Sequence, residues 1–378
     1  MSIKITKYEA ACNLGGCIEE IYQNALLGDF ECFEENSACL TGKPARLGVI
    51  SGDLPRISEQ DYDLRCNRLL LKVCGLLENE INELIKKYGA ENIAVIAATT
   101  NTGVEEFETS NNPEHAQIGN PAGFLKKHFN LKNFHASVST ACSSGIKAFS
   151  AACEILENNV AQAVIVAGVD SIAKVAVYGF DSLEVLSPKP SIPFSKKREG
   201  INIGEAAAIF LLEKDVPKGI EISGIGETTD VYHSTTPDPK AVEAVRAIKI
   251  ALNKSQIDPQ EVDYINLHGT GSISNDLMEA NAVYQVFEDK VYASSTKPLT
   301  GHCLGAAASL ETALCCKLLE ENNTKVYPHI FDGVYDENLP KIRLAQKNCE
   351  VKQIKTCLSL SFGFGGTNAA IILRRCDE

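Results

Sequence analysis

Short, uninterrupted runs of apolar residues recur along this chain, and segments with helical spacing separate them. A strand that is buried on both faces has no polar side, so its sequence is continuously apolar rather than alternating. The clearest runs are residues 93–98, 163–167, 207–213 and 369–373. Their alternation with helical patterns predicts α/β layers around largely buried sheets.

The same order of elements occurs twice. In each part a strand ends at a sharp corner, a helix of small residues follows, and another strand comes next. Helical spacing predicts a helix over residues 69–87 in the first part and another over 302–319 in the second. We therefore predict two structurally similar halves, 1–217 and 218–378.

Composition limits the classes of function. The formal charge of −13 argues against a general nucleic-acid binder, which carries a basic excess. The 14 cysteines contain no paired Cys-x-x-Cys spacing, which favours free thiols in a reducing compartment. No apolar run reaches membrane-spanning length, and residues 1–6 lack the apolar core of a signal peptide. We expect a soluble, cytoplasmic protein without membrane insertion.

Cys142 follows one of the predicted strands in the run Ser-Thr-Ala-Cys-Ser-Ser-Gly. A helix begins there, and unpaired backbone N–H groups at a helix N-terminus favour an anion, so we expect a stabilised thiolate. The competing interpretation is a small buried structural cysteine. The polar, small-residue run around it favours a nucleophile.

Two of the seven histidines also follow predicted strands. His268 lies in Asn-Leu-His-Gly-Thr-Gly, and His302 ends Lys-Pro-Leu-Thr-Gly-His. A lone histidine in such a place is more often a hydrogen-bonded core residue. No helical His-x-x-x-His or cysteine pair accompanies them, so no metal site is predicted. As neutral imidazoles, both can donate N–H to a thioester oxygen on which negative charge develops.

Two further features bear on the site. Lys297 lies five residues before His302, and we expect it to act on the electrostatics around His302 and Glu311. An exposed turn lysine is about equally compatible with the sequence. The turn Gly-Phe364-Gly-Gly lacks the pattern of a phosphate-binding loop, and a ring between glycines suits a movable gate.

These motifs resemble those of β-ketoacyl-ACP synthases, specifically the elongating branch with a Cys-His-His triad. The resemblance implies a thiolase-like fold with two similar halves in a layered αβαβα arrangement, commonly an obligate dimer. It covers roughly residues 135 to 373. The motifs that carry it are Val-Ser-Thr-Ala-Cys142-Ser-Ser-Gly, Asn-Leu-His268-Gly-Thr-Gly, Ser-Thr-Lys297-Pro-Leu-Thr-Gly-His302 and Ser-Phe-Gly-Phe364-Gly-Gly-Thr-Asn368.

The resemblance also implies a role for each matching residue. Cys142 would take the acyl chain, and His268 and His302 would bind the malonyl thioester and drive decarboxylation. The backbone N–H groups of Cys142 and Phe364 would form an oxyanion hole, with the Phe364 ring as gate. The remaining roles are support of His302 by Lys297 and Glu311, an acidic supporting pair of Asp276 and Glu279, and pantetheine binding by Thr270 and Ser272.

The predicted activity is therefore that of a 3-oxoacyl-[acyl-carrier-protein] synthase in fatty acid or polyketide and polyene biosynthesis, for example of the specialised aryl-polyene type. The alternative is a non-turnover partner subunit of a ketosynthase heterodimer, similar to a chain length factor. Such partners typically lack the reactive cysteine, and Cys142 is present. A thiolase or an initiating synthase is disfavoured because His302 occupies the third place of the elongating triad.

We predict no cofactor of the protein's own, because 4'-phosphopantetheine arrives on the carrier-protein substrate. The predicted partners are an acyl carrier protein and either a second copy, in a homodimer, or a related subunit, in a heterodimer. Carrier proteins are acidic, so a basic docking patch is expected. Arg65, Arg68 and Lys72 share one helical face and are the predicted patch, although a solvated helix face explains them equally well.

Overall fold

The computed structural model describes residues 2–29, 31–36, 40, 43–321 and 324–376. An eleven-stranded mixed sheet runs through this part of the molecule, and a small three-stranded sheet lies beside it. No helix in these ranges is both long and apolar enough to cross a membrane. In their order across the large sheet, the strands are β12 (Arg343–Leu344), β11 (Tyr292–Ser294), β10 (Tyr264–Asn266), β13 (Thr356–Gly363), β14 (Thr367–Arg375), β9 (Ile220–Thr229), β1 (Ile3–Cys12), β8 (Ala206–Lys214), β6 (Ala163–Asp170), β4 (Ile93–Ala98) and β5 (His135–Val138).

The small sheet and the helices complete the architecture. The small sheet contains β2 (Glu34–Asn36), β3 (Ala45–Gly48) and β7 (Ile203–Gly204). The α-helices are α1 (Ile18–Leu27), α2 (Arg65–Leu76), α3 (Glu78–Tyr88), α4 (Val104–Ser110), α5 (Asn120–His128), α6 (Ser144–Glu157), α7 (Lys174–Ser182), α8 (Val242–Ser255), α9 (Ile273–Phe287), α10 (Lys297–Thr300) and α11 (Ala307–Glu321). Short 3-10 turns cover Ala90–Asn92, Pro259–Glu261 and Leu304–Ala306.

The large sheet repeats one topology on each side of its centre. Outward from the centre, one side runs β1, β8, β6, β4, β5 and the other runs β9, β14, β13, β10, β11. If the five strands of each series are numbered by their order in the chain, both series read 1, 5, 4, 2, 3 from the centre of the sheet to its edge. In both, the first two pairings are antiparallel and the outer two are parallel. The expected two similar halves are thus present, while the boundary between 217 and 218 stays a prediction.

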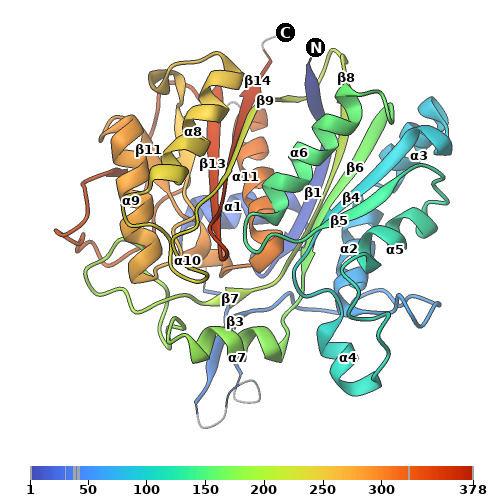
Figure 1. Cartoon of the computed structure of the whole chain (residues 1–378), viewed down its shortest axis with the longest axis horizontal. Coiled ribbons are helices and arrows are strands. Elements are labelled where there is room, and N and C mark those ends of the chain that lie inside the picture. The colour runs from blue at the N-terminus through green and yellow to red at the C-terminus, as the bar shows by residue number, and fades with distance from the viewer. Residues whose placement is uncertain (1, 30, 37–39, 41–42, 322–323, 377–378) are drawn as a thin grey trace.

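Helices separate and cover the two sides of the sheet. Helices α6 and α11 pack on each other and on strands of both sides, so they form a middle layer (Figure 1). Helices α2 and α5 cover the outer face of the first side, and α8 with α9 covers the outer face of the second. The sequence of layers is αβαβα, as expected.

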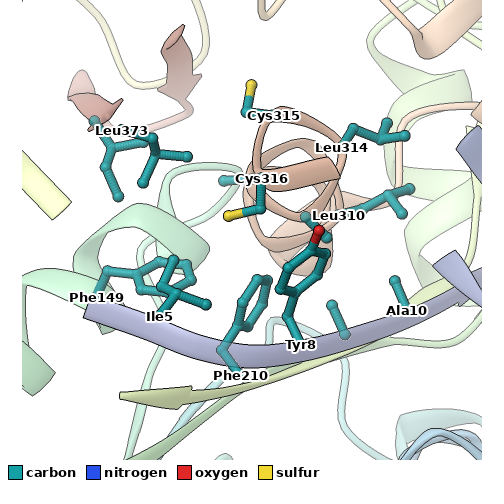
Figure 2. Close-up of a cluster of buried hydrophobic side chains, with 14 of the residues drawn as sticks. Ile5, Tyr8, Ala10, Phe149, Phe210, Leu310, Leu314, Cys315, Cys316 and Leu373 are labelled. Atoms are coloured by element: carbon teal, nitrogen blue, oxygen red, sulfur yellow. The ribbon is translucent and has the colours of Figure 1, made fainter. Parts of the chain in front are cut away.

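Strand burial follows from this layering. Alternate residues of β4 enter two different cores: Ile96 faces the middle helices, whereas Val95 faces the outer ones. Both faces of the strand are therefore apolar, which explains the continuous apolar run. Figure 2 shows the middle core, where Tyr8 of β1 and Phe210 of β8 lie opposite Cys316 of α11.

Two helix predictions are wrong in their bounds. The helix expected over 69–87 is two helices, α2 and α3, because Leu77 leaves the helical conformation at φ −118° and ψ 17° and is buried in the outer core. The helix expected over 302–319 begins only at Ala307. His302 instead forms a parallel bridge with Ile203 of β7, because Gly301 turns the chain out of α10 at φ +72°.

Candidate active site

The corner that carries Cys142 is held by its own small polar residues. Ala141 adopts a left-handed conformation at φ +53°, which is uncommon for a residue with a Cβ and turns the chain sharply. The Ser144 hydroxyl accepts a hydrogen bond from the Thr140 N–H (2.8 Å) and donates one to the Ala141 carbonyl (2.6 Å). From β13, the Ser361 hydroxyl donates to the Cys142 carbonyl (2.7 Å). The Ser/Thr run is therefore needed to build the corner.

The structure brings Cys142, His268 and His302 together. Cys142 Sγ lies 2.9 Å from His302 Nε2, although 160 positions separate the two residues in the chain. The two imidazole rings are 5.3 Å apart, centroid to centroid, and nearly perpendicular at 89°. All three side chains are buried.

Lys297 contacts a different histidine from the one expected. Its ammonium forms a buried ion pair with Glu311, as expected, and lies 3.4 Å from His268 Nδ1. It acts on His302 through its charge, which adds to burial in lowering the pKa of that imidazole, so the expected effect is present beside an unexpected contact with His268. An ammonium only donates, so Nδ1 of His268 accepts and its Nε2 carries the hydrogen. His302 Nδ1 has no hydrogen-bond partner in the part of the chain that the structure describes, so no contact there selects one tautomer of His302.

The acidic pair holds the turn after β10. Glu279 accepts hydrogen bonds from the N–H groups of His268 and Gly269, each at 2.6 Å. Asp276 accepts from the Phe194 N–H at 2.8 Å. Burial raises the pKa of Asp276 to about 6 and that of Glu279 to about 8, with these hydrogen bonds opposing the shift. Both side chains therefore fix the backbone around His268.

Burial also decides the protonation state of the site. It raises the pKa of the Cys142 thiol to about 12, and the Lys297 ammonium lowers it only partly. Burial, together with Lys297, holds the pKa of both His268 and His302 well below the usual range. The resting site therefore contains a neutral thiol and neutral imidazoles. The neutral imidazoles agree with expectation, whereas the stabilised thiolate does not, because desolvation outweighs the effect of the helix N-terminus.

A cavity of about 140 Å³ leads to Cys142 from one side. We call it the polar cavity because it carries the hydroxyls, the amides and the two imidazoles of the site, although apolar residues such as Leu183 and Val185 complete its wall. The hydroxyls of Thr270 and Ser272 lie in its wall, 3.1 Å apart. Thr235 and Asn368 also line it. The predicted pantetheine-binding residues thus lie where an extended polar ligand would reach the thiol.

An apolar cavity of about 310 Å³ reaches Cys142 from another side. Helix α7 forms one wall, with Ala176 and Gly179 exposing little side chain to it, and Ala141 and Leu304 lie on other walls. This cavity has the character of a site for a hydrocarbon chain.

Phe180 and Phe364 line both cavities and separate them, with ring centroids 5.6 Å apart. The turn that carries Phe364 lies against Cys142, because a Cβ added to Gly363 would be 3.1 Å from the Cys142 nitrogen. This places the two predicted oxyanion-hole N–H groups in neighbouring segments; their role and the gate stay predictions. Sequence reasoning missed Phe180, since no motif surrounds it.

The two arginines of the predicted basic patch form ion pairs within the molecule, and the docking role of the patch stays a prediction. Arg65 binds the buried carboxylate of Glu205, with Nε 2.9 Å from Oε2, and Arg68 binds Asp63, with Nε 2.6 Å from Oδ1. None of the patch residues lines either cavity. The helical face exists, but its guanidinium groups are engaged within the molecule.

A thiol and two imidazoles within 4.8 Å of one another also resemble a metal-ligand set. The geometry argues against it. Tetrahedral zinc would hold a sulfur and a nitrogen ligand roughly 3.5 Å apart, whereas Cys142 Sγ and His302 Nε2 are 2.9 Å apart, a hydrogen-bond distance. The Lys297 ammonium beside His268 would also repel a cation.

Known proteins that are similar to this chain belong to a family that agrees with the chemistry of this site. The model of the β-ketoacyl synthase N-terminal domain matches residues 75–217, and that of the C-terminal domain matches residues 220–330. The chain is 35% identical to 3-oxoacyl-[acyl-carrier-protein] synthase 2 of Coxiella burnetii over 69% of its own length, and 32% identical to nodulation protein E of Rhizobium leguminosarum bv. trifolii over 67%. These matches span 66% and 65% of the relatives' lengths, just under two thirds.

Solved structures show the same fold. A chain of the ketosynthase ApeO–chain length factor ApeC complex from Xenorhabdus doucetiae superposes with a TM-score of 0.94 at 34% identity, covering 99% of this chain and 98% of that one. A chain of the ishigamide ketosynthase/chain length factor gives a TM-score of 0.87 at 21% identity, covering 100% and 99%. The protein belongs to the β-ketoacyl synthase family and has its thiolase-like fold.

Proposed function

We propose that this protein is a 3-oxoacyl-[acyl-carrier-protein] synthase that condenses malonyl-ACP with an acyl chain held on Cys142, in fatty acid or polyketide and polyene biosynthesis. The observation that carries the proposal is the position of Cys142. Its sulfur lies 2.9 Å from His302 Nε2 at the junction of a polar and an apolar cavity. The family supports the same activity.

Acylation comes first. His302 Nε2 takes the thiol proton as Cys142 Sγ attacks the acyl thioester, so no free thiolate is needed in the resting site. The new S–C bond forms as the bond to the carrier's sulfur breaks, and the proton passes to the departing thiolate. The backbone N–H groups of Cys142 and Phe364 stabilise the transient oxyanion. The hydrocarbon chain then occupies the apolar cavity.

Decarboxylation and condensation follow. The malonyl thioester enters along the polar cavity, where Thr270 and Ser272 bind the pantetheine arm. The bond to the carboxylate carbon breaks, carbon dioxide leaves, and the electron pair becomes an enolate whose oxygen accepts the Nε2–H of His268. His302 donates to the same oxygen in its Nε2–H tautomer, into which it passes after acylation, since no hydrogen bond to its Nδ1 from the described residues opposes that change. The enolate carbon attacks the acyl carbon, the S–C bond to Cys142 breaks, and the thiolate takes up a proton from water, the one proton that the overall reaction consumes.

The test is intact-protein mass spectrometry after incubation with acyl-ACPs from acetyl to long-chain and polyenoyl. We expect one acyl adduct on the native protein and none on Cys142→Ala, with condensation reduced by about 10⁴-fold or more. Cys153→Ala, on the helix α6 that follows Cys142, is the matched control and should acylate normally. A Cys142→Ala variant that still condenses would refute the nucleophile assignment.

The second candidate function is that of a chain-length-factor-like partner subunit, because the ApeO–ApeC complex contains such a subunit. A wild-type chain that gains no adduct from any donor, alone or with a related subunit, would favour it. The presence of Cys142 beside His302 supports turnover instead.

The protein's partners would be an acyl carrier protein and a second subunit. Strand β5 ends the large sheet, and Phe134 just before it is 52% exposed. Val175 and Tyr178 of α7 are also exposed apolar side chains. An unpaired strand edge and exposed apolar groups suit a dimer interface. Light scattering on the purified chain distinguishes a homodimer from a monomer that needs a related subunit.

A further inference from the structure

Asp170 is a carboxylate that the catalytic steps above do not use. It ends β6, its side chain is fully buried, and no lysine or arginine pairs with it among the described residues. Its oxygens instead accept hydrogen bonds from neutral groups. The donors are the Thr99 hydroxyl (2.8 Å), the Thr100 N–H (2.8 Å) and hydroxyl (2.6 Å), the Asn101 N–H (2.8 Å) and the Gly305 N–H (2.7 Å).

These donors come from two segments that are distant in sequence. One is the corner after β4, which contributes Thr100 and Asn101 to the wall of the apolar cavity. The other is the 3-10 turn Leu304–Ala306, which begins two residues after His302. Leu304 lines the same cavity and has a left-handed conformation at φ +52°. A branched side chain adopts this conformation only where neighbouring contacts impose it, and the bond from Gly305 to Asp170 is such a contact.

The corner after β4 and the turn Leu304–Ala306 approach each other closely at Gly305. A Cβ added to Gly305 would lie 2.7 Å from Asp170 Oδ2 and 2.8 Å from Thr100 Cγ2. Glycine is therefore required at 305, and the carboxylate and the cavity wall contact the turn directly. A buried charge without a counter-ion is costly, so its satisfaction by five neutral donors makes the arrangement rigid.

We propose that Asp170 is a positioning residue for condensation: it holds two walls of the apolar cavity together and fixes the segment that begins at His302. This inference rests on the proposed function. It assigns Asp170 a role in the choice of acyl chain, because Thr100, Asn101 and Leu304 contact the cavity while Asp170 itself lies behind them. It also predicts a small electrostatic effect: burial raises the pKa of the Cys142 thiol, the Lys297 ammonium opposes this, and the carboxylates of Glu311 and, to a smaller extent, Asp170 add to the rise.

Two nearly isosteric substitutions separate the positioning effect of Asp170 on the cavity walls from its electrostatic effect on Cys142. Asp170→Asn removes the charge and places an amide N–H among donors, whereas Thr100→Val removes one donor and keeps the charge. Thr109→Val, on the exposed face of α4, is the matched control. Acylation is measured with acetyl- and long-chain acyl-ACP, and the alkylation of Cys142 by iodoacetamide is measured at pH 8 by peptide mass spectrometry.

We expect Asp170→Asn to be alkylated faster at Cys142 than the native protein at pH 8, because loss of the carboxylate lowers the pKa of the thiol. We expect Thr100→Val to leave that alkylation rate unchanged and to slow long-chain acylation about fivefold relative to acetyl acylation. If Asp170→Asn does not fold, the ratio of long-chain to acetyl acylation rates in Thr100→Val tests the proposal by itself. Long- and short-chain acylation rates that fall equally in Thr100→Val, or in a folded Asp170→Asn, would overturn the proposal. Alkylation needs no acyl donor, so it remains readable if the proposed condensation itself fails.

Discussion

The two cavities that meet at Cys142 differ in chemistry. One contains the hydroxyls, the amides and the two imidazoles of the site among apolar residues, whereas the other is lined mostly by alanine, glycine, leucine and aromatic side chains, with Thr100 and Asn101 at one wall. The difference indicates that the site receives a ligand with a polar arm on one side and an apolar chain on the other. Cys142 lies between them, so the bond that is made or broken is the one between these two parts.

The cavities are also built differently. The loop after β9, the turn after β10 and the start of α9 supply most of the polar wall. Glu279 and Asp276 lie behind it and hold the backbone by accepting hydrogen bonds from N–H groups. The apolar wall depends on the packing of α7 and on turns such as that of Leu304. We therefore expect substitutions in the polar wall to change either the rates of chemistry or the binding of the polar arm, and those in the apolar wall to change the choice of substrate.

The largest expected effect separates the two histidines. His302→Ala should slow both acylation and malonyl decarboxylation, because its Nε2 contacts the thiol, whereas His268→Ala should slow only decarboxylation. Loss of one donor to a developing oxyanion costs about 10²–10³-fold. Release of carbon dioxide and the acyl adduct are measured for each variant, with His128→Ala as control. Equal loss of acylation in both would show that the assignment of His302 to the thiol is wrong.

A smaller effect is expected in the apolar cavity. A Cβ on Gly179 would have no atom within 4 Å, so Gly179→Leu places its side chain in open space without a clash. We expect loading of long acyl chains to fall by about 10–100-fold while acetyl loading changes little. Gly75→Leu, on the exposed face of α2, is the matched control. A uniform loss for all chain lengths would mean that this cavity does not hold the chain.

The polar wall should show a binding effect. Thr270→Val combined with Ser272→Ala removes two hydroxyls, and each hydrogen bond is worth about 1 kcal/mol. We expect KM for malonyl-ACP to rise by about tenfold or more with little change in kcat. A short malonyl thioester without the pantetheine arm is the control substrate. If its KM rises equally, the hydroxyls do not contact the arm.

The smallest effect concerns pH. The pKa of His268 and that of His302 lie well below 6.5, so both imidazoles stay neutral as the pH falls through that value. We expect malonyl decarboxylation by Cys142→Ala to keep its rate from pH 7.5 to about 6 and to fall only in more acidic solution. A decline centred near pH 6.5 would show that the histidines are solvated.

Much of the fold and of the site was predictable from local patterns. Apolar runs located the buried strands because burial on both faces leaves no polar positions. Cys142, His268 and His302 were recognisable because each follows a strand in a run of small or polar residues. Phe180 was not, since a phenylalanine on a helix has the same local pattern whether it faces a core or a cavity.

The sequence by itself determined the layered α/β class, the repeated order of elements and the three reactive side chains. Only the tertiary structure decided that Lys297 contacts His268, that Arg65 is bound to Glu205, and that Cys142 rests as a neutral thiol. The physical reason is the separation along the chain of the residues that interact. Strands and corners follow from neighbours in the chain, whereas ion pairs and pKa values depend on desolvation and on charges brought together from distant segments.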